Sequence, residues 1–459
     1  MGPADRLDWS ERLKLSGLAA LSALMGLLAG VDPVVAIAVA IGCAFVLIAF
    51  ADLGLAVAVF ACEPLGVGVE EANAAKAMVV ILALAWLGYV FVRQNEHANF
   101  ATQFPAMAWV MTGFAAWVLL SLVWAENLAA TYSNFARLIA GFVVFFCVFA
   151  AVRNLDRAML LAAAFVAGAV GAAAWGLVGG VSEPDTAGRL VGGSSSPDQL
   201  ALTLVTGVAL TWGIAVSARR SPLLQVGASA AGAFCLAALF MTTSRGGLIA
   251  LAAMLVAAVF IAGRWRPAVI VAGVTVVLAG VFYFSALAPP EARERVQQLT
   301  QDRNRQAEGR TTIWTVGWRI VEANPVIGVG AGNFRHVTRH YLVEPGVVAR
   351  SDQIITLRQD AHNTYLALLA EEGIVGFALF MALLLFCLWA ALRAAANFAR
   401  DGNVPGEALA RALAIALVAL LAASFFLDEQ LNKQLWFLLA LGPAFLWVSR
   451  QAGDERRLA

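Results

Sequence analysis

The sequence predicts an all-α integral membrane protein, a polytopic bundle of about 12–14 transmembrane helices with one long, partly helical loop outside the membrane. Three observations lead to this fold class. Of the 459 residues, 61% are hydrophobic and only 13% are charged, whereas about a quarter of an ordinary soluble domain is charged. Apolar runs of span length recur along the chain. Basic residues are concentrated in alternate loops.

The apolar runs are the candidate spans, because crossing the hydrocarbon core takes about 20 mainly apolar residues in a helix. The clearest runs contain no charged residue: Val34–Phe50, Ala106–Ala125, Gln199–Ser217, Leu223–Thr242, Gly247–Ala262, Ala268–Leu287 and Ile374–Leu392. Weaker or shorter runs are Leu15–Val31, Leu53–Cys62, Ala77–Val92, Leu138–Val152, Ala158–Val181, Ala412–Leu427 and Gln434–Val448. The run Leu53–Cys62 is too short for a full span and suggests a re-entrant or broken helix.

The distribution of Lys and Arg predicts the orientation, because short loops rich in these residues stay in the cytoplasm. One set of loops and ends carries 16 basic residues, and the opposite set of short loops carries only five: Lys76, Arg137, Arg189, Arg245 and Lys433. We expect both termini to be cytoplasmic and the second set to face outward.

Charge density divides the chain into segments. Residues 1–287 read as about 11 helices with short loops, residues 288–361 as an external cap, residues 362–450 as about three further helices and residues 451–459 as a cytoplasmic tail. The cap has 18 charged residues among 74, the density of a soluble domain. Within it, Arg310–Ala323 has the apolar spacing of an amphipathic helix with Trp314 and Trp318 four residues apart, which fits either a membrane interface or packing inside the cap.

Two external arginines are candidate anion-binding residues. Arg189 precedes a hydroxyl-rich segment, and Arg245 lies in Thr242-Thr-Ser-Arg-Gly-Gly between two apolar runs. A guanidinium at the edge of the hydrocarbon usually has a partner or an anionic ligand, and its paired N–H groups match phosphate oxygens. The alternative for each is an interfacial anchor or an ion pair with a nearby carboxylate.

His362 is the candidate general base. It lies in Asp360-Ala-His-Asn-Thr-Tyr-Leu, where Asn363 or Thr364 can cap a helix that ends at Gly373. The positive end of that helix favours a neutral imidazole, which can accept a proton from a hydroxyl. A single histidine at a helix start is, however, structural more often than catalytic.

Two other motifs are weaker candidates for a functional site. His336 and His340 lack a third metal ligand, so a surface helix is favoured over a metal site. The run Gly328-Val-Gly-Ala-Gly-Asn-Phe reads as a turn, because no strand precedes it.

Four segments, in this order, resemble the O-antigen ligase and O-antigen polymerase family of bacterial envelope glycosyltransferases. They are Ser244-Arg-Gly-Gly, Gly309-Arg-Thr-Thr-Ile-Trp, Asn324-Pro-Val-Ile-Gly-Val-Gly-Ala-Gly-Asn-Phe, and His362-Asn-Thr-Tyr-Leu with Glu372-Gly-Ile-Val-Gly. The resemblance covers about Leu223–Leu392. Where the family has Asn-Pro-Asn near the first arginine, this chain has Ser196-Pro-Asp198.

The resemblance implies transfer of a glycan from undecaprenyl diphosphate to an acceptor hydroxyl, with inversion and without a metal or other cofactor. Arg189 and Arg245 would bind the diphosphate, Arg310 would support it or order the loop, and His362 would activate the acceptor. That acceptor is lipid A core for a ligase, another lipid-linked repeat for a polymerase of O-antigen or exopolysaccharide, or a protein hydroxyl.

The implied location is the bacterial inner membrane, with a periplasmic active site. The implied partners are the bilayer and potentially other polysaccharide assembly proteins, with no nucleic acid. Two alternatives remain at this stage. A polysaccharide flippase or transporter would carry polar residues at mid-bilayer and related halves, and a non-catalytic scaffold of an envelope assembly complex would leave the arginines and His362 replaceable.

Overall fold

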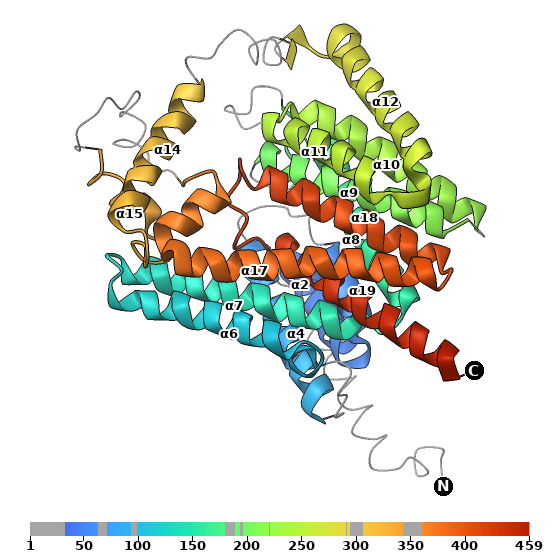
Figure 1. Cartoon of the computed structure of the whole chain (residues 1–459), viewed down its shortest axis with the longest axis horizontal. Coiled ribbons are helices and arrows are strands. Elements are labelled where there is room, and N and C mark those ends of the chain that lie inside the picture. The colour runs from blue at the N-terminus through green and yellow to red at the C-terminus, as the bar shows by residue number, and fades with distance from the viewer. Residues whose placement is uncertain are drawn as a thin grey trace.

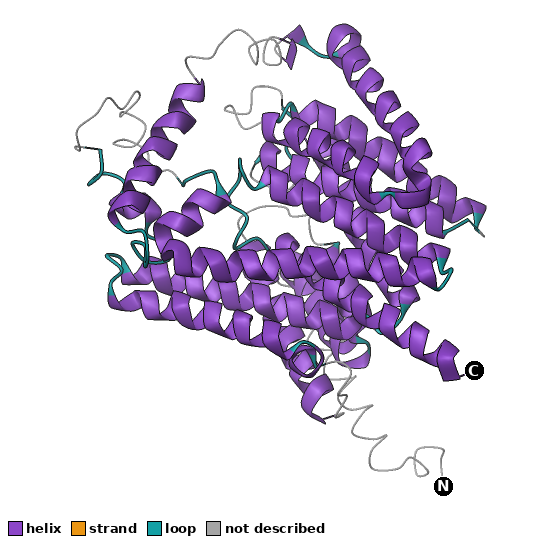
Figure 2. Ribbon diagram, in the orientation of Figure 1, coloured by secondary structure: helices purple, strands orange, loops and turns teal. Residues whose placement is uncertain are grey.

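The computed structural model describes residues 33–62, 71–92, 99–179, 189–192, 196–219, 221–290, 292–293, 306–342 and 360–458. Within those ranges every regular element is a helix (Figures 1 and 2). In the described part of the chain, eight helices are long and apolar enough to cross a membrane, and three shorter apolar helices accompany them. The predicted fold class, an all-α polytopic membrane protein, is confirmed.

The helices that precede the cap are α2 (Pro33–Ala51), α3 (Leu53–Ala61), α4 (Glu71–Leu87) with η3 (Gly88–Val92), α5 (Phe100–Gln103), α6 (Pro105–Leu120) with η5 (Ser121–Val123), α7 (Leu128–Ala151), α8 (Leu155–Gly179), α9 (Pro197–Ser217), α10 (Pro222–Thr242), α11 (Arg245–Ile261) with η7 (Gly263–Trp265), and α12 (Arg266–Phe282) with η8 (Tyr283–Leu287). The cap contains α14 (Gln306–Ala323) and α15 (Phe334–Val337). The chain ends with α17 (Thr364–Arg400), α18 (Val404–Ala423) and α19 (Lys433–Leu458).

Each predicted span from Val34 onward overlaps one of these helices, because an apolar run in lipid can satisfy its backbone hydrogen bonds only as a helix. Helices α7 and α18 begin earlier than the predicted runs Leu138–Val152 and Ala412–Leu427. The short run Leu53–Cys62 forms α3, a helix of nine residues that is mostly buried inside the bundle. The first predicted span, Leu15–Val31, lies outside the described residues.

Helices α9 and α18 form the centre of the bundle, and α12 lies at its edge. Glycines allow the central helices to approach closely, as is common between helices in membranes. A Cβ at Gly213 of α9 would lie 2.5 Å from the Cβ of Ala412 in α18, and a Cβ at Gly442 of α19 would lie 2.3 Å from the carbonyl oxygen of Cys387 in α17. Larger residues at these positions would force the helices apart.

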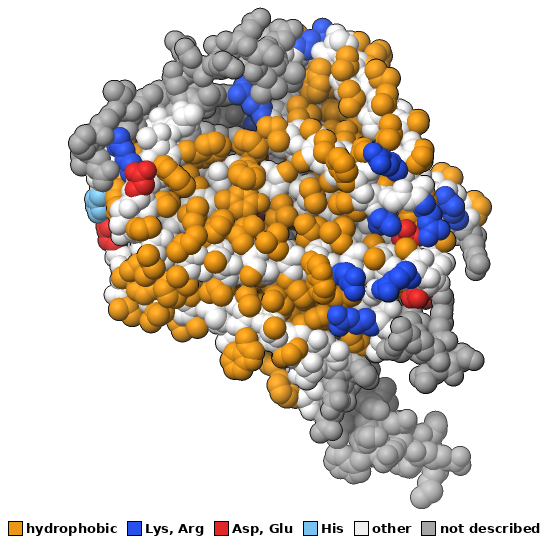
Figure 3. All heavy atoms as spheres, viewed as in Figure 1, with side chains coloured by type: hydrophobic (Ala, Val, Ile, Leu, Met, Phe, Trp, Pro, Cys, Tyr) orange, Lys and Arg blue, Asp and Glu red, His pale blue; other side chains and the backbone are white. Residues whose placement is uncertain are grey.

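The two ends of the bundle differ in charge. Figure 3 shows Lys and Arg side chains gathered toward the end where α19 finishes, beyond a broad apolar belt. Ion pairs join different segments there: Arg157 binds Asp52 at 2.6 Å, and Arg264 binds the buried Glu407 of α18, which also pairs with Arg411 within the same helix. The opposite end carries α14, α15 and the start of α17 (Figure 1).

The cap helix α14 packs inside the cap rather than presenting its apolar face outward. Its residues Ile313, Val316 and Ile320 are almost fully buried in a small core that includes Phe334 of α15 and Ala367 of α17. This result favours the second of the two expectations for this helix. The two tryptophans diverge: the side chain of Trp318 is 53% exposed, whereas the indole of Trp314 points inward.

Candidate active site

His362 is held in an unusual backbone conformation by Asp428, which lies in the loop between α18 and α19. Its φ is 48°, in the left-handed region that few non-glycine residues adopt. The carboxylate of Asp428 accepts the backbone N–H of His362 at 2.9 Å and that of Asn363 at 3.1 Å. Two charge-assisted hydrogen bonds therefore fix the backbone that carries the imidazole.

Asp428 also interacts electrostatically with His362. Burial raises the pKa of the Asp428 carboxyl, and the charge of His362 and the two N–H donors oppose that rise. Asp428 was not predicted as a site residue, and its only sequence signal is the acidic pair Asp428-Glu429 between the last two apolar runs.

The rest of the α18–α19 loop, residues 424–432, also contacts the His362 segment. The N–H of Thr364 lies within hydrogen-bond distance of the carbonyl oxygens of Ser424 and Leu427, its hydroxyl donates to Leu427, and the N–H of Glu429 donates to that hydroxyl. Glu429 is buried, and its carboxylate accepts the Asn432 amide at 2.6 Å. Burial, and then the neighbouring charge of Asp428, raise the pKa of Glu429 to about 8.

The predicted helix cap after His362 is confirmed. The Asn363 side chain accepts the N–H groups of Tyr365 and Leu366 and begins α17. The helix breaks at Gly373, whose φ of 65° and ψ of −170° are not helical. A Cβ there would lie 2.2 Å from the carbonyl oxygen of Val326, so only glycine fits this crossing.

The glycine-rich run from Gly328 to Phe334 is a turn, as predicted, and its role is structural. Gly328, Gly330 and Gly332 all have positive φ. The buried carboxylate of Glu371 accepts the N–H of Gly332 at 2.8 Å and that of Phe334 at 3.0 Å. These two hydrogen bonds join the cap to the first turns of α17, so they support His362 indirectly. His336 follows in α15, and His340 lies beyond that helix, 3.5 Å from Glu126.

Arg245 is the first residue of α11. Ser244 caps this helix by accepting the N–H of Gly247 at 3.0 Å. Within the described part of the chain, the Arg245 side chain has neither an ion pair nor a hydrogen bond, and it is partly exposed. A free guanidinium at the positive end of a helix is suited to an anionic ligand.

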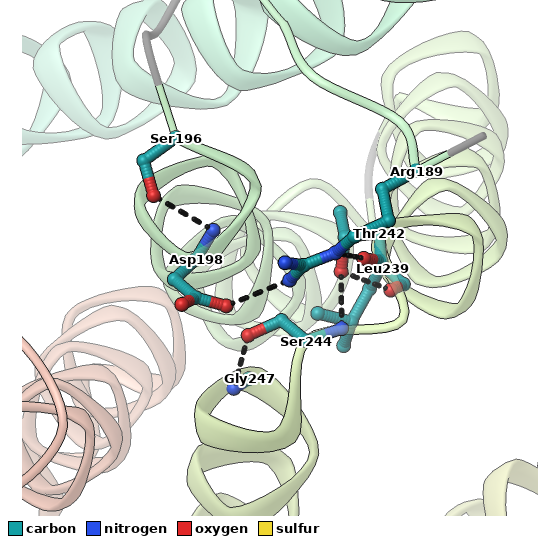
Figure 4. Close-up of polar contacts among 7 residues, drawn as sticks. All are labelled: Arg189, Ser196, Asp198, Leu239, Thr242, Ser244 and Gly247. Carbon is teal, nitrogen blue, oxygen red and sulfur yellow. Dashed lines mark hydrogen bonds and ion pairs between the residues drawn. The ribbon is translucent and has the colours of Figure 1, made fainter. Parts of the chain in front are cut away.

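Arg189 lies beside this helix start but is already paired. Its Nη2 donates to Asp198 of α9 at 2.9 Å, and its Nε donates to the carbonyl oxygen of Thr242 at 3.0 Å (Figure 4). Asp198, one of the two residues that depart from the family pattern, thus neutralises this arginine. Among the described residues, Arg245 is therefore the better placed of the two for binding an anion, and Arg189 holds the end of α10 against the start of α9.

Two aromatic side chains lie between the start of the Arg245 helix and the segment that carries His362. A Cβ on Gly246 would lie 3.2 Å from the Cβ of Phe426 in the α18–α19 loop. The rings of Phe426 and Trp314 are 6.4 Å apart, and Trp314 Nε1 donates to the carbonyl oxygen of Ala361 at 3.1 Å. One loop thus contacts both the helix that Arg245 begins and the segment that carries His362.

Arg310 falls in the first turns of α14, one helical turn before Trp314. Its side chain lies outside the described residues. The predicted role of Arg310 in supporting the diphosphate or ordering the loop stays a prediction.

The arrangement combines a positive helix start with a histidine supported by a carboxylate. Residues 230–381 match the protein-family model described as O-antigen ligase. This segment of the chain is similar to an O-antigen ligase domain. The match extends from within α10 to Met381 of α17 and includes Arg245, Arg310 and His362, while Arg189 and Asp428 lie outside it. No curated protein matches the chain.

The similarity to an O-antigen ligase domain confirms the resemblance found in the sequence and implies glycosyltransferase activity of the ligase or polymerase type. It also implies a lipid-linked glycan and an acceptor as substrates, in a multi-pass bacterial membrane protein.

Proposed function

We propose that this protein is an inverting, metal-independent glycosyltransferase that moves a glycan from undecaprenyl diphosphate to an acceptor hydroxyl on the periplasmic face of the inner membrane. The acceptor is lipid A core or the end of another lipid-linked repeat. The observation that carries the proposal is the α18–α19 loop, which contacts the start of the Arg245 helix through Phe426 and holds His362 through Asp428.

The diphosphate is assigned to Arg245 and the start of α11. Both a guanidinium and the N-terminus of a helix favour phosphate oxygens. These positive groups stabilise the charge that develops on the diphosphate as it leaves, which is the contribution a metal ion makes in other transferases.

His362 acts as the general base in this proposal. The imidazole takes the proton from the acceptor hydroxyl while that oxygen forms a bond to the anomeric carbon of the donor sugar. The bond from the anomeric carbon to the diphosphate oxygen breaks on the opposite face of the sugar, so the configuration inverts. Undecaprenyl diphosphate leaves with the bonding electrons, and Asp428 stabilises the imidazolium.

The charge distribution supports a periplasmic site. The basic side chains at the C-terminal ends of α7, α9, α11 and α17 cluster at one end of the bundle (Figure 3). By the positive-inside rule that end is cytoplasmic. His362, Arg245 and the cap would then face the periplasm, and the C-terminus would be cytoplasmic.

The test is transfer by the purified protein with a defined glycan on undecaprenyl diphosphate and EDTA throughout. One tube receives lipid A core and a second receives donor alone, and products are followed on gels for wild type, His362→Ala and Arg245→Ala. His340→Ala and Arg266→Ala are matched controls, because His340 is 63% exposed in the cap and the exposed Arg266 begins α12 at the opposite end of the bundle.

We expect transfer by wild type and by both controls, and loss of at least about 100-fold in the two site variants, as for removal of a catalytic base or an oxyanion-stabilising group. Transfer to core identifies a ligase, and ladders from donor alone identify a polymerase. Full activity in both site variants would refute the assignment of the site. Absence of transfer together with movement of lipid-linked glycan across vesicles would favour a flippase.

A further inference from the structure

Two aromatic side chains occupy the position between the helix that Arg245 begins and the segment that carries His362. Phe426 comes from the α18–α19 loop and Trp314 from the cap helix α14, and their ring centroids are 6.4 Å apart at an interplanar angle of 40°. The chain places them together from positions more than 100 residues apart. They therefore meet only when the cap is docked on the bundle.

Each side chain has one close contact and is partly exposed elsewhere. Trp314 Nε1 is bound to the carbonyl oxygen of Ala361, the residue before His362, at 3.1 Å. Phe426 is seated against Gly246, where a Cβ would come within 3.2 Å of its Cβ and 3.7 Å of its Cγ. Both side chains are only partly buried, although Trp314 also packs against the small core of the cap. This combination of a close contact with an accessible surface suits binding of a flat, partly apolar group.

The reaction places such a group here. In the proposed function the sugar attached to the diphosphate must extend from Arg245 toward the acceptor that His362 activates. A pyranose ring has an apolar face of C–H bonds, and an aromatic π face is electron-rich and attracts those weakly positive hydrogens. Aromatic contact also orients a ring without adding charge to a site that must already bind a diphosphate.

We propose that Phe426 and Trp314 form the platform for the donor sugar that is linked directly to the diphosphate, with Phe426 as the principal contact. This inference rests on the proposed function and deepens it by naming residues that recognise the sugar rather than the diphosphate. Phe426 is a binding and positioning residue that orients the anomeric carbon between Arg245 and His362. The lipid diphosphate without a sugar would gain nothing from this platform.

The test compares two ligands on the full-length protein in lipid nanodiscs: undecaprenyl diphosphate that carries one pyranose, and bare undecaprenyl diphosphate. The variants are Phe426→Leu, which removes the ring, and Phe426→Tyr, which keeps it. Phe425→Leu is the matched control in the same loop. Phe425 is 52% exposed, and its ring packs on Tyr365 rather than on Trp314, with the Phe425 and Tyr365 ring centroids 4.5 Å apart. Dissociation constants are measured for both ligands, and KM and kcat for transfer.

We expect Phe426→Leu to weaken the glycosylated donor about 3- to 10-fold, the range for loss of one aromatic contact, and to leave the bare lipid unchanged. Phe426→Tyr and Phe425→Leu should resemble wild type. Equal weakening of both ligands, or no weakening of either, would overturn the inference.

A second measurement needs no variant and remains decisive if Phe426→Leu does not fold. Wild type should bind the glycosylated donor more tightly than the bare lipid, and equal affinities would contradict the platform. Failure of the proposed function is distinguishable, because it would abolish transfer by wild type itself, whereas failure of this inference would leave wild-type transfer intact.

Discussion

Replacing Asp428 with alanine removes the two hydrogen bonds that hold His362 in the left-handed conformation. A non-glycine residue in that conformation is disfavoured by about 1–2 kcal/mol. The two N–H groups bind a carboxylate at 2.9 and 3.1 Å, and hydrogen bonds to charged groups contribute about 1.5 kcal/mol or more each. Together they outweigh the conformational cost, which explains why His362 can keep a φ of 48°.

Without Asp428 the conformational cost is no longer offset. The segment should then relax, and a difference of 1–2 kcal/mol lowers the population of the active arrangement roughly 5- to 30-fold. We expect kcat to fall by at least that factor in Asp428→Ala, because the imidazolium also loses its carboxylate. Asp428→Asn keeps one acceptor oxygen and should lose less activity.

The assay is transfer from a lipid-linked glycan, with donor affinity and thermal stability measured on the same preparations. Donor affinity should stay near the wild-type value, since Arg245 is untouched. The reasoning is refuted if Asp428→Ala keeps kcat within about twofold of wild type. It is also refuted if donor binding and kcat fall by the same factor, because that pattern indicates general disruption of the site.

Two further predictions concern stability. Gly373→Ala should lower the free energy of unfolding by more than about 3 kcal/mol, because a φ of 65° with a ψ of −170° is essentially a glycine conformation and the new Cβ meets the Val326 carbonyl oxygen at 2.2 Å. Gly402→Ala is the control, since its φ is 67° but nothing lies within 4 Å of the added Cβ, and a loss above about 2 kcal/mol there would undermine the steric argument. Burial raises the pKa of Glu429 to about 8 from a usual value of 4.5, so the folded protein binds the Glu429 proton more tightly than the unfolded chain does. The protonated Glu429 therefore stabilises the fold fully below pH 4.5, and this stabilisation is lost as the pH rises to 8. The melting temperature of wild type should therefore fall more between pH 5 and 9 than that of Glu429→Gln, and parallel curves for the two proteins would contradict the assignment.

Local sequence patterns predicted much of the fold, because a membrane constrains a chain segment by segment. Each apolar run must satisfy its own backbone hydrogen bonds, so hydropathy alone located α9, α10, α11, and α12 together with η8, within about two residues. The turn that contains Gly328 and the helix break at Gly373 were also predictable, since glycine punctuates helices for local steric reasons. The order of short motifs around His362 identified the family that the domain match confirms.

Only the tertiary structure decided which candidate residues are paired and which are available. The sequence makes Arg189 and Arg245 equal candidates for binding an anion. In the structure Arg189 is bound by Asp198, whereas Arg245 begins a helix and has no partner among the described residues. The hydrogen bond from His362 to Asp428 joins positions 66 residues apart, and the hydrogen bond from Phe334 to Glu371 joins positions 37 apart. Such pairs follow from how helices pack and where loops cross, which depends on the whole bundle, so no local pattern could fix them. The sequence by itself therefore determined the spans, the charge asymmetry and the candidate chemistry, and packing determined which of those candidates meet.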